Sequence, residues 1–177
     1  MKDWKAEIVT AVLVQQRIEE LDREGFWTRY LPEMGAKESQ LAATERSLGF
    51  AFDLQYREFL SYADGWRSFW QAVDLFGTQE LAGGPMMQIA RRQLGAIEER
   101  DFEAAVYAPI ARVLPVGASS LQRDMFLMPI ADTNGAGSVV WYDGSVIERF
   151  PSFDEFYLAM VDYNHLDLDF FEARRMG

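Results

Sequence analysis

The sequence predicts an α+β fold in which an antiparallel sheet of four or more strands packs against several helices. Apolar residues recur with a helical period in the N-terminal half. Short apolar runs follow between residues 113 and 150, joined by turns and not by helices, which predicts antiparallel neighbours. The 177 residues, 49% of them hydrophobic, can bury one sizeable core. We therefore expect a single domain over residues 1–177, with an N-terminal helix at about 4–24 and a helical insertion at about 78–112.

The first half of the chain shows the spacing of amphipathic helices. Over residues 4–24, apolar side chains recur at steps of three, four or seven. A second helix is expected over 37–48, because Gly49 stands where a C-cap glycine belongs. Asp53 is placed to cap a third helix over 54–63. The apolar face of that third helix, which we expect to be buried, consists of Tyr56, Phe59, Leu60 and Ala63.

The middle of the chain is less regular. Residues 66–84 show no clear period, apart from a short apolar run at 73–76, and are expected to be irregular. Pro85 suits the first turn of a helix, which we predict over 86–104.

The later part of the chain predicts strands and a closing helix. Asp143-Gly144, between the last two strands, is typical of a two-residue hairpin. Ser152 and Glu155 form a capping-box pattern, so a helix is expected over 152–163, followed by a short helical tail. The predicted strands cover 113–116, 125–130, 139–142 and 146–150.

The charge of the chain narrows the class of partner. There are 28 acidic and 17 basic residues, a formal net charge of −11, spread along the whole sequence. Such a field repels nucleic acid and membrane surfaces and attracts basic proteins. Solubility alone is the alternative reason for the acidity. There is no apolar signal core and no run long enough to span a bilayer, so we expect a cytoplasmic protein.

The composition excludes much catalytic chemistry. There is no Cys and a single histidine, His165, so thiolate nucleophiles and multi-histidine metal sites are ruled out. Asp162, Asp167 and Asp169 are the best candidate carboxylate cluster for Ca²⁺ or Mg²⁺, but they lack the EF-hand pattern. A hydrolase that uses two carboxylates stays open, although nothing singles out a pair. We expect no catalytic residue, cofactor or metal.

Three large aromatic residues lie close together after the third helix, in the segment 66–70. Trp66, Phe69 and Trp70 are candidate anchors for a protein partner, because tryptophan is a frequent hot-spot residue at interfaces. Asp132 and Asp143, in predicted turns, are candidate acidic contacts. The alternative is that the rings fill the core.

One stretch of the sequence resembles a known family. Residues 35–65 carry an E-x-x-L-G pattern, then a Y-R-x-F-L helix, then a turn in which Asp-Gly stands for Asn-Gly. This resembles the SUKH superfamily of Smi/Knr-type proteins, and residues 152–156 resemble its S-F-x-E-F helix. The usual proline before the Tyr helix is absent. The matched residues are Glu45, Leu48, Gly49, Tyr56, Phe59, Leu60, Asp64 and Gly65.

The resemblance implies a function as well as a mixed α+β fold. Many bacterial members are immunity proteins that neutralise toxins, often nucleases, and the family has no shared catalytic residues. It therefore implies a non-catalytic toxin inhibitor whose partner is a cognate toxin, with a basic nuclease domain as the expected target. A regulatory or scaffold module that binds another protein is the alternative.

Overall fold

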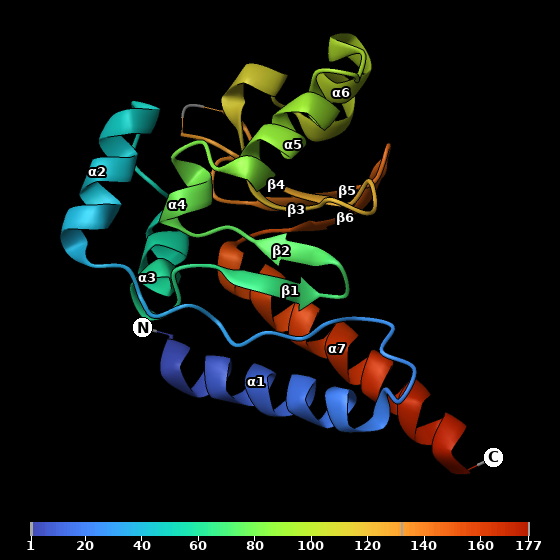
Figure 1. Ribbon diagram of the computed structural model, residues 1–177. Coiled ribbons are helices and arrows are strands. Elements are labelled where there is room, and N and C mark those ends of the chain that lie inside the picture. The colour runs from blue at the N-terminus through green and yellow to red at the C-terminus, as the bar shows by residue number, and fades with distance from the viewer. Residues whose placement is uncertain (1, 132, 177) are drawn as a thin grey trace.

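A computed structural model describes residues 2–131 and 133–176, and its centre is an antiparallel sheet (Figure 1). The strands are β1 (Trp66–Trp70), β2 (Val73–Leu75), β3 (Val113–Ser119), β4 (Met125–Pro129), β5 (Val139–Tyr142) and β6 (Val146–Phe150). The helices are α1 (Trp4–Leu21), α2 (Glu38–Leu48), α3 (Leu54–Tyr62), α4 (Thr78–Leu81), α5 (Pro85–Leu94), α6 (Glu99–Val106) and α7 (Phe153–Met176), with a 3-10 turn at Ile110–Arg112.

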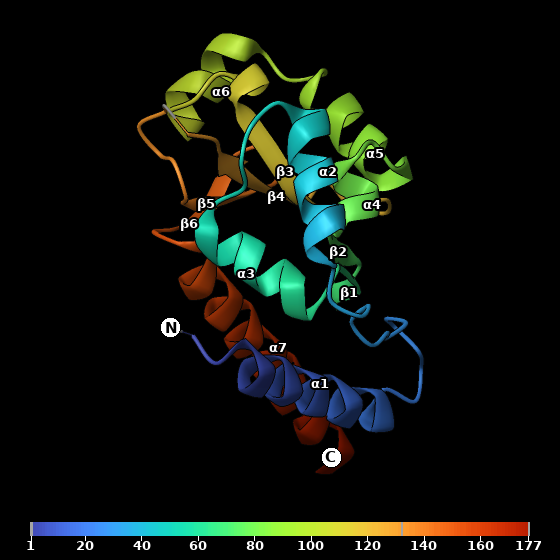
Figure 2. The same cartoon turned by 90° about the vertical axis from the view of Figure 1, so that its left-hand side faces the viewer.

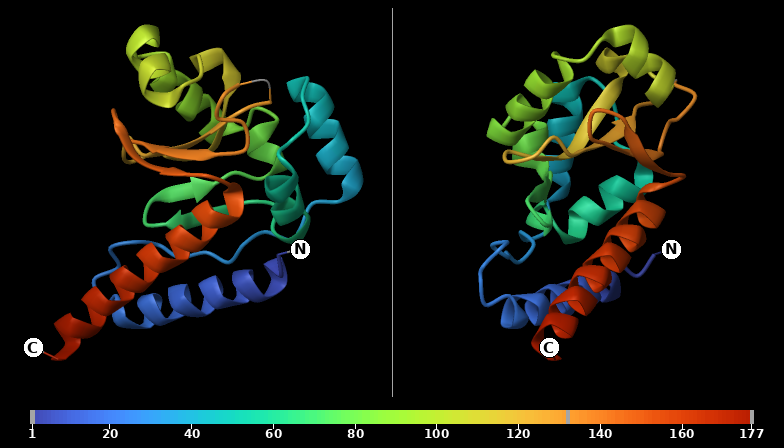
Figure 3. Two further views of the ribbon diagram at one scale, coloured as in Figure 1. Left: turned by 180° about the vertical axis from the view of Figure 1, so that it is seen from behind. Right: turned by 90° about the vertical axis from the view of Figure 1, so that its right-hand side faces the viewer.

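The order of the strands in the sheet is their order in the chain, from β1 to β6, and every neighbouring pair is antiparallel. The helices α4, α5 and α6 form the excursion between β2 and β3. In Figures 1 and 3, α5 and α6 lie on one side of the sheet, and α7 and α1 lie on the other. Figure 2 shows α1 and α7 packed beneath the sheet and α2 standing beside α4. The predicted α+β class with an antiparallel sheet is confirmed.

The helix α3 forms where its capping residue and apolar spacing predict it. The Asp53 carboxylate accepts hydrogen bonds from the backbone N–H groups of Gln55 and Tyr56, at 3.0 and 3.2 Å. These bonds satisfy donors that the first turn of a helix leaves unpaired. The preceding helix α2 ends at Gly49, which adopts a left-handed conformation with φ of 79°. Both predicted caps are confirmed.

The apolar face of α3 is the centre of an aromatic core. Tyr56, Phe59 and Leu60 are fully buried, as predicted. The Phe59 ring lies 5.4 Å from the ring of Trp4 on α1 and 5.6 Å from that of Tyr157 on α7. Edge-to-face and tilted ring pairs at these separations add stability beyond the area that they bury. The core thus joins three helices that are far apart in the sequence.

The segment 66–70, predicted to be irregular, is the edge strand β1. Its five residues oppose only the three residues of β2, so the register shifts within the strand. Ser68 takes a positive φ of 49° in this bulge, which removes the period-2 pattern of a regular strand. The Phe69 carbonyl accepts hydrogen bonds from the buried side chains of Gln15 and Asn164, at 2.6 and 3.2 Å. Helices α1 and α7 thereby satisfy the irregular edge.

Two helix predictions are corrected by the structure. The single helix predicted over 86–104 is the pair α5 and α6, because the chain turns at Gly95, a poor helix former. Ile97 packs against the core within this turn. The helix predicted over 152–163 with a separate short tail is the continuous α7, whose distal half packs on α1 through Phe171. The first helix ends at Leu21, three residues before its predicted end.

Truncation of Phe59 tests the aromatic core. We expect Phe59→Ala to lower the free energy of unfolding by about 3–5 kcal/mol, because the cavity lies between three helices. Urea unfolding followed by tryptophan fluorescence measures the change. The control is Leu54→Ala in the same helix: Leu54 is 81% exposed, so its truncation should change stability little. Equal effects of the two substitutions would contradict this account of the core.

Candidate functional site

The structure places the few residues of catalytic type apart from one another. Within residues 2–131 and 133–176, no group of three His, Cys, Asp or Glu side chains is arranged to hold a metal ion, and the candidate cluster of Asp162, Asp167 and Asp169 on α7 forms no such group. His165 lies on the exposed side of α7, where its Nδ1–H donates to the Val161 carbonyl at 3.0 Å. None of the described helices is both long and apolar enough to cross a membrane.

The three aromatic residues proposed as anchors point into the core. Trp66, Phe69 and Trp70 are 1%, 0% and 9% exposed, respectively. The Trp66 indole N–H donates to the Tyr30 carbonyl at 2.7 Å, and the Trp70 ring lies 4.8 Å from that of Trp141. This burial favours the core alternative over the interpretation of the three rings as partner anchors, because rings that are already packed offer little surface to a partner.

Of the two acidic residues proposed beside those rings, Asp143 is separate from them. Asp143 is exposed at the β5–β6 turn, where the nearest cation is Arg123, 3.9 Å away. Among the described residues, no hydrogen bond, ion pair or ring contact joins Asp143 to the three rings. Asp132 lies outside the described residues.

The family-like motif residues hold α2 and α3 together. Glu45 accepts hydrogen bonds through the same oxygen from the Phe52 N–H at 2.9 Å and from the Arg57 Nε–H at 3.1 Å. Arg57 also pairs with Glu38 at the start of α2. Leu48 packs against the core at the end of that helix. These residues fix the angle between the two helices, and their carboxylates are neutralised by Arg57.

The last motif residues build a close backbone crossing. Gly65 has a φ of +93°, and a Cβ atom there would lie 2.6 Å from the Gly77 nitrogen. A Cβ atom on Gly77 would lie 2.0 Å from the Asp64 carbonyl oxygen. Asp64 also accepts hydrogen bonds from the backbone N–H and the hydroxyl of Thr78, at 2.6 and 2.7 Å. Only residues without side chains fit at this crossing, so both positions require glycine.

Tyr56 ties the same crossing to the core. Its hydroxyl donates to the Phe76 carbonyl at 2.7 Å. Burial raises the pKa of Tyr56 well above its usual range, so the hydroxyl stays protonated and remains a donor. The crossing is therefore held on one side by α3 and on the other by the start of α4.

A groove of about 540 Å³ opens over the crossing, and we call it the Gly65–Gly77 groove. One wall is the connection before α2, where Met34 is 91% exposed, and the other wall is α4 with the start of α5. The groove is lined by Glu33, Met34, Asp64, Gly65, Trp66, Arg67, Asp74, Leu75, Phe76, Gly77, Gln79, Glu80 and Met86. Its floor is apolar and its rim is acidic.

Four carboxylates and one guanidinium line this groove, which gives a formal charge of −4 + 1 = −3. Asp74 accepts a hydrogen bond from the Ser68 N–H at 2.8 Å, and Glu80 accepts one from the Met86 N–H at 2.8 Å. Among the described residues, none of the four carboxylates has a cationic group within 4 Å. The single cation, Arg67, stacks 4.0 Å above the ring of Tyr30.

Burial affects the pKa of one of these carboxylates, Asp74. It raises the pKa of Asp74, and the hydrogen bond from Ser68 and the charge of Arg67 oppose that rise only in part. The ionised form of Asp74 is thus insufficiently stabilised within the protein. An added positive charge at the groove would favour that form.

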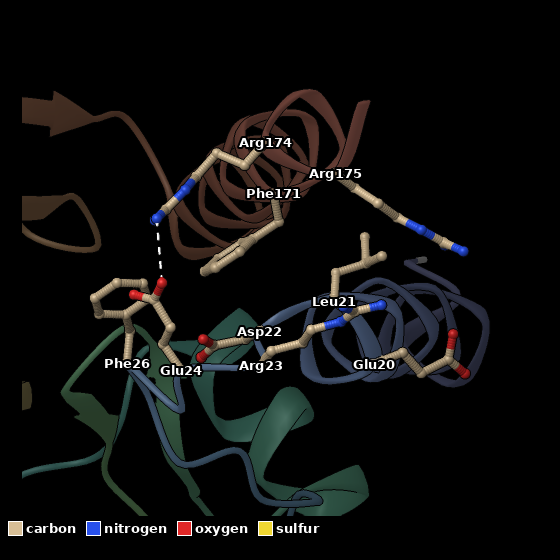
Figure 4. Close-up of a pocket in the computed structure, with 9 residues that line it drawn as sticks. All are labelled: Glu20, Leu21, Asp22, Arg23, Glu24, Phe26, Phe171, Arg174 and Arg175. Carbon is tan, nitrogen blue, oxygen red and sulfur yellow. Dashed lines mark hydrogen bonds and ion pairs between the residues drawn. The ribbon is translucent and has the colours of Figure 1, made fainter. Parts of the chain in front are cut away.

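A second hollow, of about 490 Å³, lies between the C-terminal ends of α1 and α7. Figure 4 shows that both acidic and basic side chains surround it, with Arg174 reaching toward Glu24, 3.3 Å away. Three carboxylates, from Glu20, Asp22 and Glu24, face three guanidinium groups. Because these charges balance, the hollow offers no preference for a charged partner, and the Gly65–Gly77 groove is the better candidate.

The groove residues come from parts of the chain that the sequence analysis did not connect. Only Asp64 and Gly65 belonged to a recognised motif. Glu33 and Met34 lie in a connection without a period, and Asp74 and Glu80 are single acids. Gly77, directly before a short helix, was the sequence feature that could have indicated a close backbone approach. Its partner, Gly65, is twelve positions earlier in the sequence.

The comparisons with known proteins give a family and no closer relative. A family model described as the SMI1 / KNR4 family (SUKH-1) matches residues 35–159, more than half of the chain. The match covers most of the groove and leaves out α1 and the distal half of α7. The search of curated proteins finds no match.

A methyl group at the crossing should destabilise the protein. We expect Gly77→Ala to lower the free energy of unfolding by about 1–3 kcal/mol, because backbone atoms must shift to admit the new Cβ atom. The control is Gly95→Ala, where φ is −65° and the nearest neighbouring atom to an added Cβ is 3.4 Å away. That substitution should raise stability by about 0.4–1 kcal/mol. Similar urea midpoints for both variants would contradict the close approach.

Removal of the Asp74 charge should change how stability depends on pH. Because the pKa of Asp74 is raised in the folded protein, the folded state binds this proton more tightly than the unfolded chain does. The contribution of Asp74 to stability is therefore fully present below the ordinary aspartate pKa, and it is lost as the pH rises through the raised pKa of the folded protein. We expect the stability of Asp74→Asn, relative to the unsubstituted protein, to increase over that interval.

Asp154 provides a control of opposite sign. The hydrogen bond from the Ser152 side chain lowers the pKa of Asp154, so its contribution is present above the ordinary aspartate range and is lost on acidification. Asp154→Asn should lose relative stability as the pH rises. Thermal unfolding of both variants between pH 3 and pH 7, about the range in which aspartates titrate, measures the two trends. Trends of the same sign would show that the assignment for Asp74 is wrong.

Proposed function

This chain belongs to the SMI1 / KNR4 family (SUKH-1), and on that premise we propose that it is a non-catalytic immunity protein. It binds a cognate toxin protein and neutralises it. The toxin class that fits best is a nuclease with a basic surface.

The observation that carries this proposal is the unneutralised acidic groove on a chain of net charge −11. A nuclease must present positive charge to hold phosphate groups, and an acidic protein is attracted to that same surface. Complementary charge also accelerates association and disfavours wrong partners. Fast and selective capture is what protection against a toxin requires.

The groove carboxylates support binding more than catalysis. Asp64, Asp74 and Glu80 each accept a hydrogen bond from a backbone N–H group of a neighbouring strand or helix. A general base must be free to reach a proton on a substrate. Carboxylates that hold backbone segments in place contribute a fixed negative field instead, which suits recognition of a charged partner.

The test is inhibition of any toxin domain that is encoded beside the gene for this chain. We expect the purified proteins to form a stable complex, and the nuclease activity of the toxin to fall in proportion to the amount of this chain added. Co-expression should also restore growth of cells that produce the toxin. Association should slow as the salt concentration rises, because steering by charge is screened.

Other outcomes separate the alternatives. A stable complex that leaves toxin activity unchanged would favour the regulatory or scaffold function. Inhibition of a toxin without a basic surface, insensitive to salt, would retain the immunity function and contradict its electrostatic basis. No binding to any neighbouring toxin domain would contradict the proposal.

A further inference from the structure

We infer that the Gly65–Gly77 groove receives a basic side chain, arginine or lysine, that projects from the partner protein. This inference rests on the proposed function, because it names the contact by which the toxin is held. It locates the binding of the basic partner in one groove, whereas the net charge alone would attract such a partner to the whole surface.

The groove carboxylates differ in ion pairing from other carboxylates of the protein. Elsewhere in the structure, arginines already neutralise acids: Arg57 pairs with Glu38 and Glu45, and Arg174 pairs with Glu24. The groove has four carboxylates, and among the residues that the structure describes none of the four has such a partner. A cation that enters therefore gains attraction without first displacing an internal one.

Arg67 is held on an aromatic ring, away from the groove carboxylates. Its guanidinium stacks over Tyr30 at 4.0 Å, where the aromatic face attracts it. It stays outside the 4 Å range of Glu33, Asp74 and the other groove carboxylates. Arg67, the one cation among the described residues that line the groove, is thus held by an aromatic ring and leaves the acidic rim available.

Part of the groove lining is apolar. Met34, 91% exposed, stands on one wall and Met86 on the other. Methionine adapts its shape to a partner, and lysine and arginine carry long aliphatic stems that pack on apolar surface. Two methionines beside a carboxylate rim fit both parts of such a side chain.

The floor makes the groove a preformed site. Side chains are excluded at Gly65 and Gly77, and the hydrogen bonds of Asp64 with Thr78 and of Tyr56 with Phe76 hold the crossing in place. A site that is open before binding avoids the cost of ordering its own chain. The groove therefore requires no rearrangement to admit a side chain.

A peptide probe tests the groove without any toxin. The probe is acetyl-Gly-Arg-Gly-Arg-Gly-amide, and its control has citrulline in place of arginine, which keeps the shape and removes the charge. Isotope-labelled methionine methyl groups report the site by nuclear magnetic resonance. We expect the Met34 and Met86 signals to shift with the arginine peptide only, while the buried Met125 and Met160 signals stay fixed. Equal shifts with both peptides, or none, would overturn the inference.

Charge variants provide the second arm. Glu33→Gln combined with Asp74→Asn preserves shape and the acceptor for the Ser68 N–H, and should weaken binding of the arginine peptide about tenfold. The matched control, Glu155→Gln with Asp169→Asn on α7, removes the same total charge outside the groove and should change binding by about twofold or less.

Arg67→Gln supplies an effect of opposite sign. It removes the only positive charge of the groove, so the arginine peptide should bind more tightly. Damage to the fold would not produce that gain. Weaker binding by this variant would overturn the inference.

The same variants with the cognate toxin separate the two levels of the proposal. If the unsubstituted protein inhibits the toxin and the groove double variant inhibits it equally well, the groove assignment fails and the immunity function stands. If the peptide binds in the groove but no toxin is inhibited, the groove assignment stands and the proposed function fails.

Discussion

The close approach of two backbone segments at Gly65 and Gly77 is the constraint on which much of this structure depends. It brings the end of α3 against the start of α4, although twelve residues and the β1–β2 hairpin separate the two glycines. Asp64 fastens the crossing through Thr78, and Tyr56 fastens it through the Phe76 carbonyl. Because Tyr56 also belongs to the buried face of α3, the aromatic core and the crossing fix each other. The hairpin is thereby held at the edge of the sheet, and the groove opens above the crossing.

Local chemistry was sufficient to predict α2, α3 and the later strands. Gly49 and Asp53 act within one helical turn, and the spacing of Tyr56, Phe59 and Leu60 needs no distant information. The strand β1 could not be predicted in this way, because a bulge with a positive φ at Ser68 removes the period-2 pattern. The Phe69 carbonyl of this strand instead accepts hydrogen bonds from buried polar side chains of α1 and α7. That compensation exists only in the folded protein.

The candidate site shows the same division between local and distant information. The sequence motif located Asp64 and Gly65, but the carboxylates that share a groove with them lie in three other segments. The aromatic residues that composition made prominent, Trp66 and Trp70, are packed inside. Exposure of an aromatic residue depends on which face of a strand it occupies, and the bulge changes that face. Periodicity alone could not supply this information.

The net charge of a chain says more about where a partner binds when it is known which carboxylates have no neighbouring cation. The acidic residues of this chain are spread over its whole length, and some of them are held in internal pairs, such as Glu38 and Glu45 with Arg57. A partner approaching from a distance responds to the total, because the field of all charges sets the rate of encounter. At contact, only carboxylates without a neighbouring cation distinguish one surface from another. The groove has four of these beside exposed methionine, and its glycine floor keeps it open. Under the proposed function, the general acidity of the chain would account for the attraction of a basic partner, and the groove would account for where the surface of that partner is held.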